Sequence, residues 1–174
     1  MPFVEQVVSG TKRALRPLAD PDRASGAEAY MKGVAPFLGI DAASRRAALK
    51  PVFAALPKPS SSDLGQAALA LMNLKQREFH YAAYDLIAFF NDCADRTFLA
   101  TFGQQLICTK SWWDTVDGLG TAMVSPLLYR YPNRKLVQKW SRSNNIWLVR
   151  AAIQHQRGLR EETDVDYVLG ICSQ

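Results

Sequence analysis

Helical periodicity runs through nearly the whole chain, and no other feature constrains the fold as much. Apolar residues recur three and four positions apart in successive windows, whereas the strict alternation typical of β-strands is almost absent. Turn-forming clusters separate the windows: Pro36-Phe37-Leu38-Gly39, Pro57-Lys58-Pro59-Ser60, Tyr131-Pro132-Asn133 and Ser143-Asn144. The sequence therefore predicts an all-α protein.

Helices are predicted near Phe3–Leu18, Asp22–Val34, Asp41–Leu56, Ser62–Leu74, Arg77–Asn91, Asp95–Cys108, Ser111–Tyr131, Pro132–Arg142, Asn145–Leu159 and Asp164–Cys172. Two such helices with a short connection make a unit of about 35–40 residues, which is the period of HEAT-like repeats. We therefore expect residues 1–174 to form a single domain, an α-solenoid of antiparallel helix pairs with one concave face. A compact helical bundle is the alternative architecture.

Composition narrows the class of protein. Of the 174 residues 48% are hydrophobic, enough for a continuous core, but no segment approaches the roughly 20 apolar residues of a membrane helix. The N-terminus does not resemble a signal peptide. Three cysteines without metal-ligand spacing are expected to be small core residues in a reducing cytoplasm, and two distant histidines disfavour a metal site or a Ser-His-Asp triad. We expect no cofactor and no metal.

The charge pattern permits a polyanionic partner. The net charge is +5, and the basic residues occur in small groups at probable helix ends and loops: Arg45-Arg46, Lys75 with Arg77, Arg130 with Arg134-Lys135, Arg142, and Arg157 with Arg160. Spaced groups of this kind favour a face that contacts phosphates repeatedly. An ordinary solvated surface is the alternative for any single group.

The segment from Ser111 to Asp117 combines two tryptophans with two carboxylates. Ser111 three residues before Asp114 predicts a helix N-cap with an acid in the first turn, which gives Asp114 a local structural role. Trp112 shares a core-facing stripe with Val116 and the apolar residues that follow. Trp113 and Asp117 lie one turn apart on a neighbouring face, next to small residues, as in an exposed site. Alternatively they are a half-buried aromatic and a solvated acid.

The helix that begins near Asn145 carries two stripes. Its predicted core stripe is Ile146, Val149 and Ile153. Its second stripe consists of Trp147, Arg150, Gln154 and Arg157. A guanidinium in the second stripe suits the binding of a phosphate by Arg150. The alternatives are stacking of Arg150 on Trp147 or pairing with an acid such as Glu161.

Several segments together resemble the AlkD-type DNA alkylation-repair glycosylases, a HEAT-like family. In family order these segments are Tyr30-Met31-Lys32, Pro36-Phe37-Leu38-Gly39-Ile40, Arg45-Arg46, Arg77-Glu78-Phe79-His80-Tyr81 with Asp85-Leu86, Lys110 to Asp117, and Ser143 to Arg150. The resemblance covers roughly residues 30 to 164, and Ser-Trp-Trp-Asp-Thr-Val-Asp is its most specific part. It implies a monomeric, cytoplasmic enzyme, nucleoid-associated when bound to DNA. The implied reaction is hydrolysis of the N-glycosidic bond of N7- or N3-alkylpurines, such as 7-methylguanine, in duplex DNA.

The resemblance also assigns roles to residues. It implies that Trp113 is the catalytic aromatic residue, Asp117 the catalytic acid and Arg150 the phosphate-binding arginine. Tyr30 matches a tyrosine of the family's concave DNA-binding surface, and the DNA contacts expected beside it and Arg150 are Arg45, Arg46 and Arg77.

The sequence departs from the family pattern at two places. Val149 stands where the family usually has the first of two adjacent arginines. Family members usually continue through further helices that supply another tryptophan, and we expect this chain to lack them. A non-catalytic HEAT-like DNA-binding or protein-scaffold module is therefore the alternative function.

Overall fold

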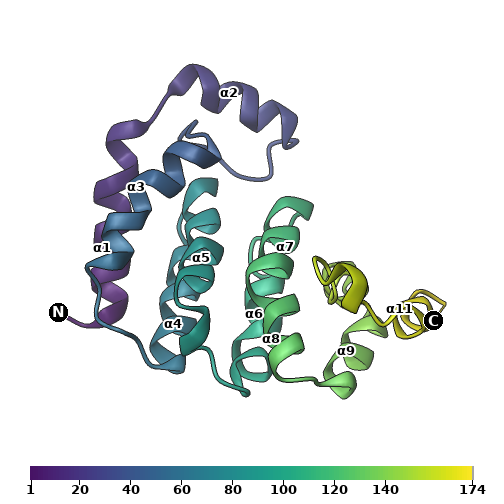
Figure 1. Ribbon diagram of the computed structural model, residues 1–174. Helices are drawn as coiled ribbons and strands as arrows, with labels where there is room; N and C mark the ends of the chain where they lie inside the picture. The colour runs from purple at the N-terminus through teal and green to yellow at the C-terminus, as the bar shows by residue number, and fades with distance from the viewer. Residues whose placement is uncertain (174) are drawn as a thin grey trace. The chain divides into compact units, whose positions relative to one another are not determined.

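The computed structural model describes residues 1–173, which form helices joined by short loops (Figure 1). The α-helices are α1 (Phe3–Leu15), α2 (Pro21–Tyr30), α3 (Ala42–Ala54), α4 (Ser61–Met72), α5 (Arg77–Phe89), α6 (Gln104–Cys108), α7 (Trp113–Leu119), α8 (Ser125–Arg130), α9 (Arg134–Ser141), α10 (Ile146–Ile153) and α11 (Val165–Cys172). No strand occurs in the described part of the chain. The all-α prediction is confirmed.

Shorter helical segments modify the predicted pattern. A π-helical segment, Leu99–Gly103, leads into α6, and a second one, Gly120–Val124, joins α7 to α8. Short 3-10 turns occupy Arg16–Leu18, Asn91–Cys93 and Arg160–Glu162. The helix predicted to reach Leu159 ends at Ile153, and Gly158 in the following turn has a φ of 93°, a left-handed conformation outside the helical range.

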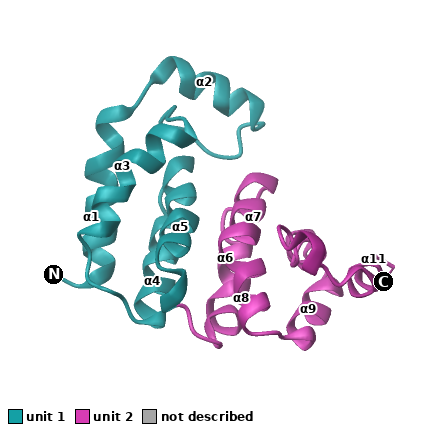
Figure 2. Ribbon diagram, in the orientation of Figure 1, with its two compact units in different colours: residues 1–93 teal, residues 94–174 magenta. Residues whose placement is uncertain are grey.

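The chain divides into two compact units, residues 1–93 and residues 94 onward (Figure 2). Each unit has its own buried apolar residues, including Leu71 and Ile87 in the first and Val116 and Met123 in the second. The single domain and the concave face remain predictions.

In the first unit α1 packs against α3 and α4, and α5 packs against both α3 and α4. The connection between α4 and α5 is short, from Asn73 to Gln76, so these helices form an antiparallel hairpin. A buried carboxylate anchors the loop before α3. Glu78 of α5 accepts hydrogen bonds from the backbone N–H groups of Leu38, Gly39 and Ile40 at 2.7, 2.8 and 3.1 Å.

In the second unit α7 packs against α6 and α10, and α10 packs against α9 and α11. The stripe predicted for the helix after Ser111 is confirmed, because Val116, Leu119, Met123 and Leu127 are all buried. The fully buried Trp140 of α9 lies close to Gly103, where an added Cβ would come within 3.2 Å of the indole.

Two predictions about burial are wrong. Helix α10 buries Leu148, Ala151 and Ala152, whereas Ile146 of the predicted core stripe is 67% exposed. The core-facing stripe is displaced because α10 packs against α6, α7, α9 and α11 at once. The cysteines are free thiols, but Cys108 and Cys172 are exposed and Cys93 is half-buried, so they are not core residues.

None of the helices in the described residues is long and apolar enough to span a membrane.

Candidate active site

Helix α7 begins at Trp113, one residue later than a serine cap at Ser111 would require. Trp112 is the N-cap residue, and its backbone N–H donates to the hydroxyl of Thr115 at 3.3 Å. The Ser111 hydroxyl instead donates to the carbonyl of Ile107 in α6 at 2.7 Å. The prediction of Ser111 as the cap is wrong, although Asp114 does lie in the first turn, where an acid favours the helix dipole.

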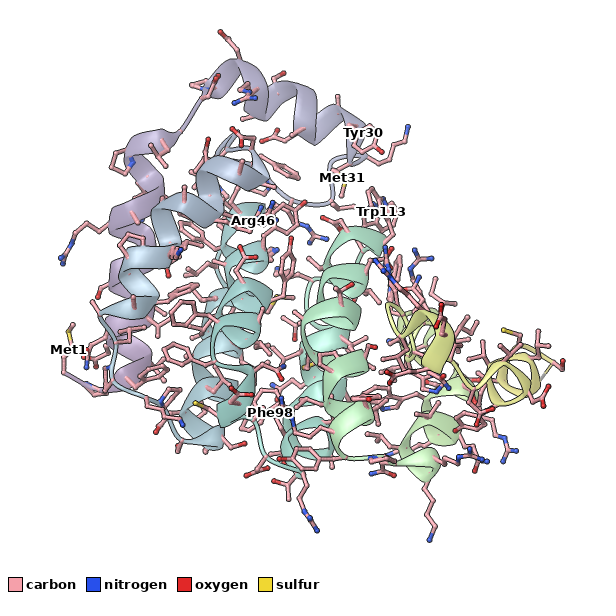
Figure 3. The ribbon with its side chains drawn as sticks, viewed as in Figure 1. Met1, Tyr30, Met31, Arg46, Phe98 and Trp113 are labelled. Atoms are coloured by element: carbon pink, nitrogen blue, oxygen red, sulfur yellow. The ribbon has the colours of Figure 1, made fainter. Side chains whose placement is uncertain are left out.

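The two tryptophans have different environments, as the periodicity predicts. Trp113 is 40% exposed, and it lies in the first turn of α7 (Figure 3). Trp112 is less exposed, and its ring packs against Trp147 of α10 with 5.6 Å between the ring centroids. This tryptophan pair joins the beginnings of α7 and α10, so residues about one turn further along the two helices meet.

Asp117 and Arg150 are the residues that meet there. The Arg150 guanidinium donates through Nε to Asp117 Oδ1 at 2.6 Å and through Nη2 to Asp117 Oδ2 at 2.8 Å, a bidentate ion pair. Arg157, from the turn after α10, places Nη1 3.3 Å from Asp117 Oδ2. The side chains of Asp117, Arg150 and Arg157 are 19%, 38% and 50% exposed. A half-buried carboxylate is therefore flanked by two arginines that solvent reaches.

The arginines control the ionisation of Asp117. Partial burial by itself raises its pKa, but the hydrogen bond and charge of Arg150, the charge of Arg157 and a hydrogen bond with Gln154 outweigh that effect and lower the pKa below the ordinary value. The pKa of Arg150 is raised by its hydrogen bond to Asp117. Asp117 is thus a carboxylate at neutral pH, and Arg150 is a cation.

The backbone that follows Asp117 departs from regular α-helix at Gly120. The π-helical segment begins three residues after Asp117, and the Thr121 hydroxyl within it donates to the Asp117 carbonyl at 3.1 Å. Segments of π-helix inside α-helices are rare and occur frequently at functional sites.

The first unit holds the other predicted DNA contacts, and only two of them are accessible. Tyr30, at the end of α2, and Arg46, on α3, are exposed (Figure 3). Arg45 is buried, where it donates to Asp85 at 2.8 Å and lies 4.9 Å from the centre of the Tyr81 ring. Arg77 is also buried, with Nη1 3.3 Å from His80 Nδ1. Arg45 and Arg77 hold the interior of this unit together and do not present their guanidinium groups to a phosphate.

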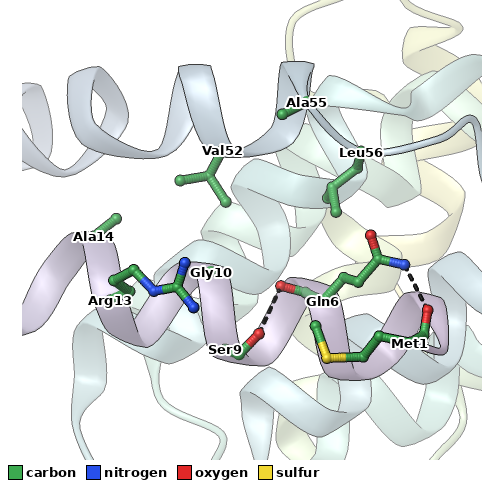
Figure 4. Close-up of a pocket in the computed structure, with 9 residues that line it drawn as sticks. All are labelled: Met1, Gln6, Ser9, Gly10, Arg13, Ala14, Val52, Ala55 and Leu56. Atoms are coloured by element: carbon green, nitrogen blue, oxygen red, sulfur yellow. Dashed lines mark hydrogen bonds between the residues drawn. The ribbon is translucent and has the colours of Figure 1, made fainter.

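A cavity of about 380 Å³ between α1 and α3 is separate from these residues (Figure 4). Its lining is mostly apolar or uncharged, and Arg13 is its charged side chain. Within residues 1–173, no group of three or more His, Cys, Asp or Glu side chains is placed to hold a metal ion.

Sequence reasoning did not assign Arg157 or Gln154 to the site. A signal for both was present, because they continue the stripe of Trp147 and Arg150 at helical spacing. Helical spacing alone could not show that both side chains approach Asp117. The carboxylate that both residues approach lies 33 positions before Arg150, and only the packing of α7 against α10 brings it there.

Comparison with known proteins shows the family and the fold of the chain. Residues 11–174 match the sequence profile of a family described as DNA alkylation repair enzyme. A solved structure, a predicted DNA alkylation repair enzyme from Enterococcus faecalis, superposes with a TM-score of 0.75 at 25% sequence identity, covering 89% of this chain and 73% of that one. No curated protein matches the chain. Because the family profile spans nearly the whole sequence, this chain belongs to the DNA alkylation repair enzyme family.

Proposed function

We propose that this protein is a DNA glycosylase that hydrolyses the N-glycosidic bond of positively charged alkylated purines in duplex DNA. Membership of the DNA alkylation repair enzyme family supports DNA as substrate or partner. The observation that carries the proposal is Asp117, a carboxylate kept ionised by two arginines one helical turn from the exposed indole of Trp113.

The chemistry of an alkylated purine suits a site with one carboxylate. Alkylation at N7 or N3 puts a positive charge on the base. When the bond from C1′ to the base nitrogen breaks, its electron pair stays on the base and neutralises that charge. The leaving base needs no proton, so a general acid is unnecessary. The sugar carries the positive charge instead, in a transition state that resembles an oxocarbenium ion.

Asp117 is assigned two tasks in this reaction. Its negative charge stabilises the developing sugar cation, and its oxygens orient the water that attacks C1′ and accept the proton which that water loses. A carboxylate whose pKa is lowered is a weak base, so electrostatic stabilisation is the larger contribution. Trp113 offers the electron-rich face of its indole to the cationic sugar or base.

Arg150 is assigned to the DNA backbone. It contacts Asp117 through Nε and Nη2, and its Nη1 group makes no hydrogen bond within residues 1–173, so one guanidinium can bridge Asp117 and a phosphate oxygen. Tyr30 and Arg46, both exposed, are proposed as further contacts to the duplex.

The test is to incubate the protein with duplex DNA carrying 7-methylguanine and to measure free base by chromatography. We expect release above the spontaneous rate, and loss of most of that release in Trp113→Ala. Trp112→Ala should instead lower the melting temperature, because Trp112 packs against Trp147. A wild-type protein that binds the duplex and releases no base would favour the non-catalytic DNA-binding module.

A further inference from the structure

The second arginine at Asp117 has no role in the mechanism so far. Arg157 is contributed by the turn after α10, and its single contact to Asp117, at 3.3 Å, is longer than either contact of Arg150. Its backbone is held firmly. The buried Ser125 hydroxyl donates to the Arg157 carbonyl at 2.9 Å, and the Arg157 N–H donates to the Gln154 carbonyl at 2.8 Å. A fixed backbone therefore points a long, half-exposed side chain at the carboxylate.

The net charge of the cluster formed by Asp117, Arg150 and Arg157 indicates what Arg157 could contribute. Asp117 and Arg150 alone form a neutral pair, which has no net attraction for a phosphate. With Arg157 the cluster carries one positive charge in excess, which matches one phosphodiester. A phosphate bound at Nη1 of Arg150 shares the charge of that guanidinium with Asp117, and without a second cation the half-buried carboxylate would be less well compensated.

We propose that Arg157 is a positioning residue that keeps hold of the Asp117 carboxylate when Arg150 engages a DNA phosphate. The inference rests on the proposed function, since it assigns Arg150 to the backbone. Arg157 touches neither the sugar nor the base in this scheme, and it acts through Asp117.

Few groups other than Arg157 could supply a second positive charge beside Asp117. Of the elements that pack against α7, the π-helical segment carries no titratable side chain, and α6 carries only the Cys108 thiol, whose pKa is raised by burial so that it stays neutral. Helix α10 contributes Arg150 as its single charged residue. On α7 itself Asp114 lies three residues before Asp117 and is another acid. Arg157 is thus the second cation that compensates Asp117 when Arg150 shares its charge with a phosphate.

The direct test follows the ionisation of Asp117 by the ¹³C chemical shift of its carboxyl group. The samples are wild type, Arg157→Gln, Arg157→Lys and Arg160→Gln, each free and bound to unmodified duplex DNA. Arg160 is exposed and three residues from Arg157, so Arg160→Gln removes the same charge as a matched control. In free protein all four should keep Asp117 ionised, because the bidentate contact of Arg150 remains.

The DNA complexes should differ. Asp117 in the Arg157→Gln complex should become protonated at a higher pH than in the wild-type complex, whereas the Arg157→Lys and Arg160→Gln complexes should behave as wild type does. Identical titrations in the wild-type and Arg157→Gln complexes would overturn the inference. This measurement does not depend on base release. If the wild-type protein proves inactive, the proposed function fails, but the titrations of the DNA complexes still test the role of Arg157.

Release of 7-methylguanine adds a second readout. Each unit by which the Asp117 pKa exceeds the buffer pH lowers the ionised fraction about tenfold. Arg157→Gln should therefore lose more activity at low pH than at neutral pH, with recovery in Arg157→Lys. A loss that is equal at every pH and is not restored by lysine would mark Arg157 as merely structural and overturn the inference. Arg157 is half-exposed and makes a single contact of 3.3 Å to Asp117, so the melting temperature of Arg157→Gln should stay close to that of wild type.

Discussion

Asp117 is held by two arginines, and these contacts determine how activity should respond to pH. Its pKa in the folded protein lies below the ordinary value of about 3.9 for an aspartate. Base release should therefore be independent of pH from about 8 down to about 5, after subtraction of spontaneous loss in the same buffers. An acid limb with a midpoint near neutrality would show instead that Asp117 works as a base with a raised pKa.

The lowered pKa of Asp117 also determines how the stability of the fold depends on pH. Because the pKa is lower in the folded state than in the unfolded state, the ion pairs of Asp117 stabilise the protein fully above the unfolded pKa. That stabilisation is lost as the pH falls through the lower, folded pKa.

Individual residues also show where sequence reasoning reaches its limit. Helical spacing correctly separated the exposed Trp113 from the more buried Trp112. It could not separate the buried Arg45 from its exposed neighbour Arg46, because two adjacent arginines look alike in sequence. The partner that keeps Arg45 inside, Asp85, lies 40 positions further along the chain and is found only in the folded structure.

At the scale of elements, the loop before α3 depends on one buried side chain. Glu78 accepts hydrogen bonds from three backbone N–H groups there. In Glu78→Gln an NH₂ group replaces one carboxylate oxygen, so the Leu38 N–H should meet a second donor and lose its acceptor. An unsatisfied buried group costs about 1–3 kcal/mol, and we expect the free energy of unfolding to fall by that amount in urea titrations. Glu5→Gln on the exposed side of α1 is the control, and equal midpoints for the two variants would refute the role of Glu78.

Helix α10 shows why an element's existence is easier to predict than its orientation. The apolar spacing predicted a helix there, and the structure has one from Ile146 to Ile153. The predicted core face was wrong because the largest apolar residues do not decide which side is buried. Helix α10 turns Leu148 and two alanines toward its neighbours and leaves Ile146 in solvent.

At the scale of the whole molecule, the net charge of +5 predicts salt-dependent binding to duplex DNA. Affinity should fall steeply with salt, and Arg46→Gln should lower the slope of log K against log salt by about one, the effect of losing one phosphate contact. Arg13→Gln removes an equal charge from α1 in the same unit and should leave the slope unchanged. Binding that is insensitive to salt would point to a protein partner.

Asp117 is proposed as the catalytic carboxylate, and single-turnover release of 7-methylguanine by Asp117→Asn and Asp114→Asn tests this role most directly. The two substitutions remove the same charge three residues apart on α7, so they form a matched pair. Removing a well-placed electrostatic group costs about 10²–10³ in rate, and we predict that loss for Asp117→Asn, with melting temperature and DNA affinity nearly preserved. Asp114→Asn should stay within a few-fold of wild type and lose about 1 kcal/mol of stability at most. The opposite pattern, an inactive Asp114→Asn and an active Asp117→Asn, would contradict the account.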